Sequence, residues 1–384
     1  MLLSGREQFS PFYGGALARW TFEVYRRLQD VADVTVLGYP TQPDERYTIR
    51  HQTSWIAPAC ASLARIPYLR RWEDHLWLKS LGRRLRESDV IHVHNRPQWV
   101  EILRELGVQK RIVLHLQNDH VGHWAPTELD RLAEQVDVVV VCSGYLRRTF
   151  ETRSEALAAK TRVVFNGVDT QLFYPREDLR EAQTMLFVGR FAREKGVLEL
   201  VRAFSNVGKS YPEARLVIVG TTGFGRHAET AYVKEVRAQA AEIAETRCGK
   251  VEFVGYVHHD SGLPGYFQRA TVFCCPSLFQ EPFGLVNAEA MACATPVIGS
   301  ERGGIPEVLG DTGVLVDPED TDALATAVGG LLESCQERKR LGWEAYERCM
   351  RLFDWEVIAH EWAGVLTGNP AGFCGCHGAQ AVTQ

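Results

Sequence analysis

The 384-residue sequence has no long hydrophobic run and no excess of basic residues. No apolar stretch approaches the ~20 residues that a helix needs to cross a bilayer, so no transmembrane helix is expected. The first residues, MLLSGREQFS, lack the basic start and long apolar stretch of a signal peptide. Because 43 Lys and Arg stand against 48 Asp and Glu, nucleic acid is not expected as a partner.

The ten cysteines show no regular disulfide spacing, which predicts a reducing, cytoplasmic location. Cys142, Cys274 and Cys275 fall inside apolar runs and are expected to behave as small buried hydrophobic residues. A Cys/His cluster at residues 374–377 lies in a Gly-rich segment and lacks a fourth ligand for a metal site. Residues 368–384 are therefore predicted to form a flexible tail.

The most informative stretch is EPFGLVNAEAMACATP at residues 281–296. It follows an apolar run that predicts a buried strand, and residues 284–293 are predicted to be helical. The amino end of this helix offers free N–H groups suited to an anion. Glu281 and Glu289 bracket the turn, and eight helical steps would separate them by ~12 Å. That spacing exceeds the ~5–9.5 Å of paired glycosidase carboxylates and suits two hydroxyl-rich parts of one elongated ligand.

Glu281-Pro282-Phe283-Gly284 followed by Glu289 resembles the E-x7-E motif of glycosyltransferase family 4, whose members are retaining enzymes of the GT-B fold. The resemblance implies that Glu281 holds the sugar hydroxyls of a nucleotide-sugar donor and that Glu289 holds its ribose. It also implies donor contacts at Phe283, Gly284 and Leu285. The alternative is a capped helix with one solvated glutamate.

Two further turns resemble donor-phosphate contacts of the same family. The segment TMLFVGRFAREKG predicts a strand that ends before Arg190, with Lys195 opening the next helix. Arg and Lys at such a place can hold a diphosphate without a metal ion. Gly14 and Gly15 form a predicted strand-to-helix turn that would lie against the diphosphate, unless it is a loop without a ligand. The stretch ending at Val257 resembles the edge that meets the nucleobase.

The N-terminal half departs from the family at one position. Family members usually carry a histidine at the end of the strand that RIVLHL predicts, and here that place falls on Gln117. Asp119 or His120 could reach the same space, or Gln117 could bind the sugar without ionising. Gln117 and His120 are therefore both candidate catalytic residues.

Residues 60–88 combine seven basic residues with Trp72 and Trp77. A basic amphipathic helix of this kind can lie on an anionic membrane, at the inner face for a cytoplasmic protein. The alternative, which is commoner, is a helix packed on its own domain with a solvated basic face.

Two other motifs resemble ligand-binding sequences but do not predict a ligand. The glycines after residue 219 follow the order G-x-x-G-x-G, not the dinucleotide order G-x-G-x-x-G, so NAD is not expected. Asp320-Thr321-Asp322 resembles a D-x-D metal motif, but Asp320 is better placed to cap the helix that follows. No cofactor or divalent metal ion is expected.

The alternation of strands and helices predicts an α/β protein with two Rossmann-like, doubly wound parallel-sheet domains facing a central cleft. The resemblance to glycosyltransferase family 4 implies that this is the GT-B fold. The expected parts are an acceptor-binding domain (1–168), a donor-binding domain (169–352), a returning helix (353–367) and the tail (368–384).

The predicted function is a retaining, metal-independent glycosyltransferase that moves a sugar from a UDP-, GDP- or ADP-sugar to a glycan, lipid-linked or protein acceptor in cell-surface glycan synthesis. The alternatives are a nucleotide-sugar-binding protein with little activity and a sugar-nucleotide epimerase of the same fold.

Overall fold

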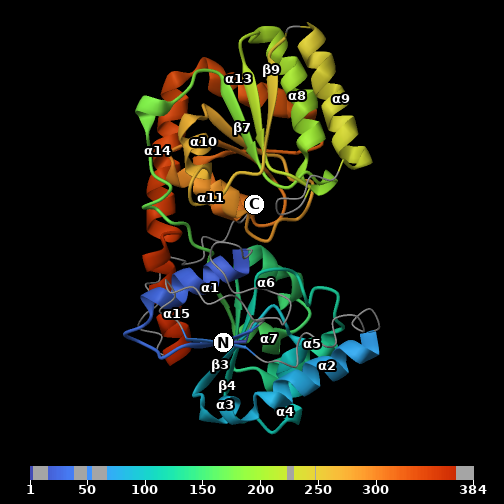
Figure 1. Cartoon of the computed structure of the whole chain (residues 1–384), viewed down its shortest axis with the longest axis vertical. Helices are drawn as coiled ribbons and strands as arrows, with labels where there is room; N and C mark the ends of the chain where they lie inside the picture. Colours follow the sequence, from blue (N-terminus) through green and yellow to red (C-terminus); the bar gives the residue numbers. More distant parts are fainter. Residues whose placement is uncertain (3–15, 39–49, 54–66, 223–228, 247, 369–384) are drawn as a thin grey trace. The chain divides into compact units, whose positions relative to one another are not determined.

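The computed structural model describes residues 1–2, 16–38, 50–53, 67–222, 229–246 and 248–368, and these form two compact units. Unit 1 comprises Met1–Cys142, Leu146–Val164 and the chain from Trp355 onward, while unit 2 comprises Ser143–Tyr145 and Phe165–Asp354. Each unit is a parallel sheet flanked by helices (Figure 1). The predicted α/β class with two doubly wound sheets is confirmed.

Unit 2 contains a six-stranded parallel sheet of order β12-β11-β10-β7-β8-β9. Counted from β7, the order read from the other edge is 3-2-1-4-5-6, the doubly wound pattern of dinucleotide-binding folds. The strands are β7 (Thr184–Val188), β8 (Arg215–Val219), β9 (Lys250–Gly255), β10 (Val272–Cys275), β11 (Val297–Ser300) and β12 (Val314–Val316).

The helices of unit 2 bury apolar faces on this sheet, as parallel sheets require. Helices α8 and α13 pack against each other, and α11 packs against α14. The helices are η1 (Glu177–Leu179), η2 (Arg193–Lys195), α8 (Val197–Ser210), α9 (Ala231–Thr246), α10 (Leu263–Arg269), α11 (Leu285–Ala292), α12 (Ile305–Leu309), η3 (Gly310–Thr312), α13 (Thr321–Glu333) and α14 (Cys335–Leu352).

Unit 1 repeats the same winding. Leu2 bridges in parallel to Leu37 on one side and to Val93 on the other, so the start of the chain lies between β1 and β3. The strands are β1 (Thr35–Gly38), β2 (Arg50–Thr53), β3 (Val90–His94), β4 (Arg111–Leu116), β5 (Val138–Val141) and β6 (Thr161–Val163). The predicted opening strand is thus confirmed as a pair of bridges, whereas β2 was not predicted.

The helices of unit 1 include one from the far end of the sequence, α15, which packs against α1. Trp20 of α1 and Trp362 of α15 are fully buried, with ring centroids 4.7 Å apart. The helices are α1 (Ala16–Arg27), α2 (Pro67–Ser80), α3 (Gly82–Glu87), α4 (Gln98–Glu105), α5 (Pro126–Gln135), α6 (Gly144–Glu151), α7 (Glu155–Ala159) and α15 (Trp355–Thr367). The segment predicted to return to the N-terminal domain forms α15, which packs within unit 1.

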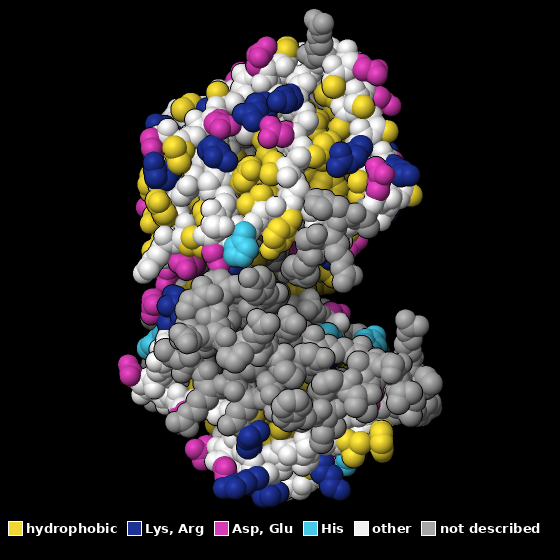
Figure 2. All heavy atoms as spheres, viewed as in Figure 1, with side chains coloured by type: hydrophobic (Ala, Val, Ile, Leu, Met, Phe, Trp, Pro, Cys, Tyr) yellow, Lys and Arg dark blue, Asp and Glu magenta, His cyan; other side chains and the backbone are white. Residues whose placement is uncertain are grey.

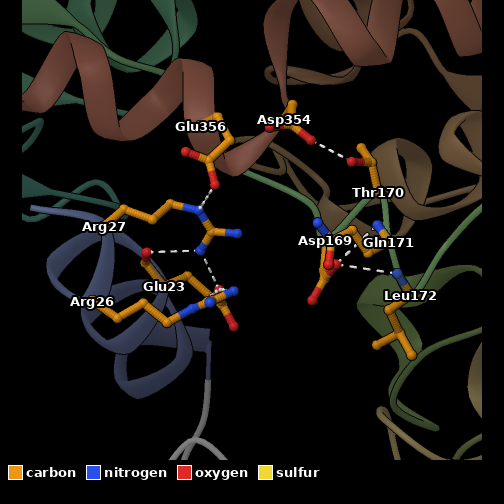
Figure 3. Close-up of polar contacts among 9 residues, drawn as sticks. All are labelled: Glu23, Arg26, Arg27, Asp169, Thr170, Gln171, Leu172, Asp354 and Glu356. Carbon is orange, nitrogen blue, oxygen red and sulfur yellow. Dashed lines mark hydrogen bonds and ion pairs between the residues drawn. The ribbon is translucent and has the colours of Figure 1, made fainter. Parts of the chain in front are cut away.

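Polar contacts hold the chain on either side of the last passage between units, which falls between Asp354 and Trp355. In unit 1, Arg27 of α1 donates to Glu356 of α15 at 2.7 Å (Figure 3). In unit 2, the Thr170 hydroxyl donates to the Asp354 carboxylate, and Asp169 accepts from the backbone N–H of Gln171. Each unit therefore anchors its own end of the passage.

Most of the described apolar side chains in the basic stretch, residues 60–88, are buried within unit 1. Trp77 is buried and its ring lies 5.0 Å from that of Trp99 on α4, centroid to centroid. Arg71 donates to Glu101 and Glu105 of the same helix at 2.8 and 2.7 Å. These contacts favour the packed-helix interpretation of residues 67–87. Residues 60–66 lie outside the described part of the chain.

The structure also confirms a predicted helix cap and the predicted burial of three cysteines. The Asp320 carboxylate accepts from the backbone N–H groups of Asp322 and Ala323, so it caps α13 as predicted. Cys142, Cys274 and Cys275 are buried as predicted, and burial raises the pKa of the Cys275 thiol to about 12.

Among the helices of the described residues, none is long and apolar enough to span a membrane.

Candidate functional site

The candidate site lies in unit 2, where β7 and β10 are neighbours and the winding of the sheet reverses. In doubly wound sheets, ligands bind outside the carboxyl ends of the strands at this switch point. The segment after β7 carries Arg190 and Lys195, and the segment after β10 carries Glu281. The topology therefore brings two predicted parts of the site to one edge of one sheet.

The segment after β7 turns tightly into α8. Arg190 is half exposed and contacts Glu194 at 3.3 Å, four residues along the chain. Gly196 has a positive φ of 69°, and a Cβ there would lie 1.8 Å from the carbonyl oxygen of Pro276. Because only glycine tolerates both constraints, this position brings Lys195 against the segment that leaves β10.

Lys195 and Glu281 form an ion pair between the two segments. The same Glu281 oxygen, Oε1, accepts from the hydroxyl of Ser277 at 3.1 Å. Both charged side chains are mostly buried, so the pair is less screened than an exposed one. The structure thus places a cation next to the glutamate that the sequence assigns to the sugar.

The turn between Glu281 and α11 places backbone groups at the site. Gly284 has a φ of 83° and precedes the first residue of α11, so the predicted helix is confirmed. The first N–H groups of an α-helix lack partners within it and suit an anion. The ring of Phe283 is instead buried, 5.9 Å from that of Phe165 and 5.5 Å from that of Phe353, centroid to centroid. Phe283 can therefore offer a ligand only its backbone.

Glu289 on α11 is held by a histidine that sequence reasoning missed. His259 Nε2 lies 2.9 Å from Glu289 Oε1, and His259 Nδ1 lies 2.9 Å from the Asp260 carboxylate. An imidazole can donate to both acids only when it is protonated. His259 lies in the loop after β9, and nothing in the local sequence indicates its contact with Glu289, because the two residues are 30 positions apart.

The second oxygen of Glu289 is more informative for function. Glu289 is only 7% exposed, and its Oε2 is buried without a hydrogen-bond partner among the described residues. An unpaired buried acceptor of this kind costs about 1–3 kcal/mol, and a carboxylate more. A ligand hydroxyl donating to Oε2 would remove that cost, while His259 keeps the carboxylate in place.

A glycine pair supports the Glu281 turn from behind. Gly304 donates its backbone N–H to the carbonyl oxygen of Glu281 at 2.6 Å. Gly303 has a φ of 68°, and a Cβ there would lie 2.3 Å from the same carbonyl oxygen. The two glycines therefore fix the position of the backbone at Glu281.

A hollow of about 300 Å³ opens at the carboxyl ends of β8 and β9, next to α9. Arg237 lies over the ring of Phe253 in its wall, with the guanidinium 4.8 Å from the ring centroid. The lining residues are Phe191, Gly220, Thr221, Thr222, Glu229, Val233, Arg237, Phe253, Val254 and Gly255. Val254 and Gly255 belong to the stretch ending at Val257 that is predicted to meet a nucleobase, and Val257 itself does not line the hollow.

The remaining predicted residues belong to unit 1. Gln117 is buried at the end of β4, and its backbone N–H donates to the Asn95 side-chain oxygen at 2.7 Å. His120 is half-buried, and burial together with the nearby Arg96 charge lowers its pKa. Asp119 is exposed and caps the turn at Gly122. Gly14 and Gly15 lie outside the described residues.

On the face of unit 2 that Figure 2 shows, Lys and Arg side chains are interspersed with Asp and Glu.

Two parallel-sheet α/β units, with cations and acids at a switch point, define the GT-B class of glycosyltransferases. Two family models agree: "Glycosyltransferase Family 4" matches residues 13–172 and "Glycosyl transferases group 1" matches residues 182–334. The chain belongs to glycosyltransferase family 4. It is a glycosyltransferase of a retaining family whose members take the sugar from a nucleotide-sugar donor.

Individual relatives support this assignment. The chain is 29% identical to spore coat protein SA of Bacillus subtilis over 79% of this chain and 85% of that one. It is 34% identical to alpha-maltose-1-phosphate synthase of Mycolicibacterium smegmatis over 62% of this chain and 65% of that one. A crystal structure of Anabaena HepE in complex with UDP has the same fold, with a TM-score of 0.74 at 22% identity, covering 96% of this chain and 99% of that one.

The close approach of Gly303 to the Glu281 turn yields a prediction. Gly303→Ala should displace the Glu281 carbonyl, lower stability by about 1–3 kcal/mol and weaken donor binding, because both φ and space exclude a Cβ. Chemical denaturation and donor titration measure the two effects.

The matched control is Gly330→Ala in α13, where a Cβ meets nothing within 4 Å. That change should stabilise the chain by roughly 0.5–1 kcal/mol and leave donor binding unchanged. Equal effects of the two substitutions would contradict the packing role of Gly303.

Proposed function

We propose that this chain is a metal-independent glycosyltransferase that transfers a sugar, with retention, from a nucleoside-diphosphate sugar to an acceptor in cell-surface glycan or glycoconjugate synthesis. The observation that carries the proposal is the juxtaposition at the switch point of unit 2. Arg190, Lys195 and the amino end of α11 can meet a diphosphate there, and Glu281 carries a carboxylate beside Lys195.

The proposed donor position follows from the chemistry of each group. The diphosphate takes the cations and helix N–H groups, because charge-assisted bonds from Arg and Lys suit phosphate oxygens. The ribose takes Glu289, whose unpartnered Oε2 accepts a hydroxyl proton. The sugar takes Glu281, and the nucleobase takes the edge from Val254 to Val257.

Catalysis in this proposal depends on stabilising the leaving group. The nucleoside diphosphate gains negative charge as the glycosidic bond breaks, and Arg190 and Lys195 are preorganised cations for that charge. Lys195 forms an ion pair with Glu281, and this contact holds its ammonium group at the site. The acceptor proton passes to the donor phosphate as the acceptor attacks from the same face. Gln117 and His120 of unit 1 are proposed to contact the sugar or acceptor.

We do not propose peripheral membrane contact. Apolar side chains of α2 and α3, including Trp77 and Leu85, are buried and pack within unit 1. Trp72 is 58% exposed, but the neighbouring Arg71 is already paired with glutamates of α4.

A donor screen tests the proposal directly. UDP-, GDP- and ADP-sugars are added to the protein, and the unfolding temperature is measured. One nucleotide series should raise it, since a ligand at 100 times its Kd adds about 2.7 kcal/mol to stability. No shift with any series would contradict the proposal. A sugar that is epimerised but stays on its nucleotide would favour the epimerase alternative.

The leaving-group cations provide a second prediction. Arg190→Ala and Lys195→Ala should each lower kcat tens-fold or more, because a charged hydrogen bond is worth about 1.5–3 kcal/mol. Steady-state kinetics with the donor found in the screen measures the effect.

The control for these cations is Arg193→Ala, a basic residue of the same turn that pairs with Glu235 of α9 at 3.1 Å. It should retain near-wild-type kcat. If Arg190→Ala and Lys195→Ala behaved like this control, the account of leaving-group stabilisation would be wrong.

The two glutamates should separate binding from turnover. Glu289→Ala should weaken binding of the free nucleotide at least several-fold, since the ribose loses a charged acceptor worth about 1.5–3 kcal/mol. Glu281→Ala should keep nucleotide affinity and lose turnover, because its proposed partner is the sugar. Calorimetry with the free nucleotide, compared with donor kinetics, distinguishes them. The reverse pattern would exchange the two roles.

A further inference from the structure

Unit 1 contains a cluster of three buried histidines that the donor chemistry does not use. His92 and His94 lie two residues apart on β3 and therefore on one face of the sheet. His115 of β4 is paired in register with His94, so all three side chains share that face. Their ring centroids are 4.3–5.5 Å apart. Helices α1 and α15 cover them with the rings of Trp20 and Trp362.

The ring nitrogens of this histidine cluster have almost no partners. Each histidine is at most 2% exposed. His92 Nε2 and both nitrogens of His94 and His115 meet no hydrogen-bond partner among the described residues. Each unpaired polar atom in such a place costs about 1–3 kcal/mol. The opposite face of the same strands carries buried hydrophobic residues such as Val93 and Leu114.

One contact prepares the cluster for a ligand. The hydroxyl of Tyr25 on α1 lies 2.7 Å from His92 Nδ1. If Nδ1 carries the proton and donates to the Tyr25 oxygen, Nε2 keeps its lone pair free. Metal-bound histidines almost always have their second nitrogen held in this way.

We propose that His92, His94 and His115 bind one divalent transition-metal ion, with zinc as the ion to test, inside the core of unit 1. One nitrogen from each ring lies within 4.8 Å of the others. A tetrahedral zinc with Zn–N of ~2.0–2.1 Å needs its ligands about 3.4 Å apart. Binding therefore requires the side chains to rotate, and His94 would leave its stack on His115.

The site would be structural. It would join β3 to β4 just before Asn95 and Gln117, the residues at the ends of these strands that contact each other. A metal ion there would brace this edge of unit 1. It would supply no group to the sugar-transfer step, so the test below is independent of the proposed function.

The test is metal analysis of the full chain, produced without a histidine tag in zinc-supplemented medium and then dialysed. About one zinc per chain is expected, because a closed three-histidine set holds the ion through dialysis. Replacement by Co²⁺ should give the visible absorption bands of tetrahedral coordination. Substoichiometric zinc, with no change in unfolding temperature on adding Zn²⁺, would overturn the proposal.

Variants assign the ion to the cluster. His115→Gln should remove the bound zinc, and Tyr25→Phe should lower zinc affinity about 10–100-fold by freeing His92. His360→Gln, an exposed histidine of α15, should keep it. A variant with Cys374, Cys376 and His377 replaced should also keep it. Zinc retained by His115→Gln, or lost from the last variant, would place the ion elsewhere.

A final measurement covers the case in which His115→Gln does not fold. Wild-type protein is stripped with a strong chelator, and its unfolding temperature is compared before and after metal is restored. The temperature should fall on stripping and recover with Zn²⁺ but not with Mg²⁺, since imidazole suits zinc and oxygen ligands suit magnesium. An unchanged temperature would show that the cluster is a metal-free part of the core.

Discussion

The ion pair between Lys195 and Glu281 is the contact on which the donor site depends. It joins the segments that leave β7 and β10, the two strands between which the winding of unit 2 reverses. Two glycines make this contact sterically feasible. Gly196 fits against the Pro276 carbonyl, and Gly303 fits against the Glu281 carbonyl. The chemistry of the site therefore rests on close approach of backbone, which any side chain at these glycines would prevent.

The acids of the site differ in what holds them. Glu281 is held by Lys195. A phosphate that bound Lys195 would therefore weaken the ion pair that holds Glu281. Glu289 is held by His259, and its second oxygen is left without a partner. In the proposed site, Glu281 would thus be coupled to the diphosphate through Lys195, whereas Glu289 is fixed by the protein. This difference is a physical reason for two carboxylates of one motif to take separate roles.

Much of the fold could be predicted because the signals are local. Apolar runs bounded by glycines specify buried parallel strands, and Asp320 specifies the start of α13 through its own side chain. The places of Arg190, Lys195 and Glu281 after strand ends were also predictable, because each lies a few residues beyond β7 or β10, while their roles toward a donor stay a prediction. By contrast, β2 was missed, because RHQT contains no apolar periodicity.

What the sequence determined by itself was the order of elements and the residues at the carboxyl ends of strands, because strand period and turn chemistry act over a few residues. Only the tertiary structure decided that His259 orients Glu289, that Phe283 is buried, and that His92, His94 and His115 form one cluster. Each of these depends on contacts between elements distant in sequence. Strand pairing and helix packing create such contacts, and no local pattern encodes them.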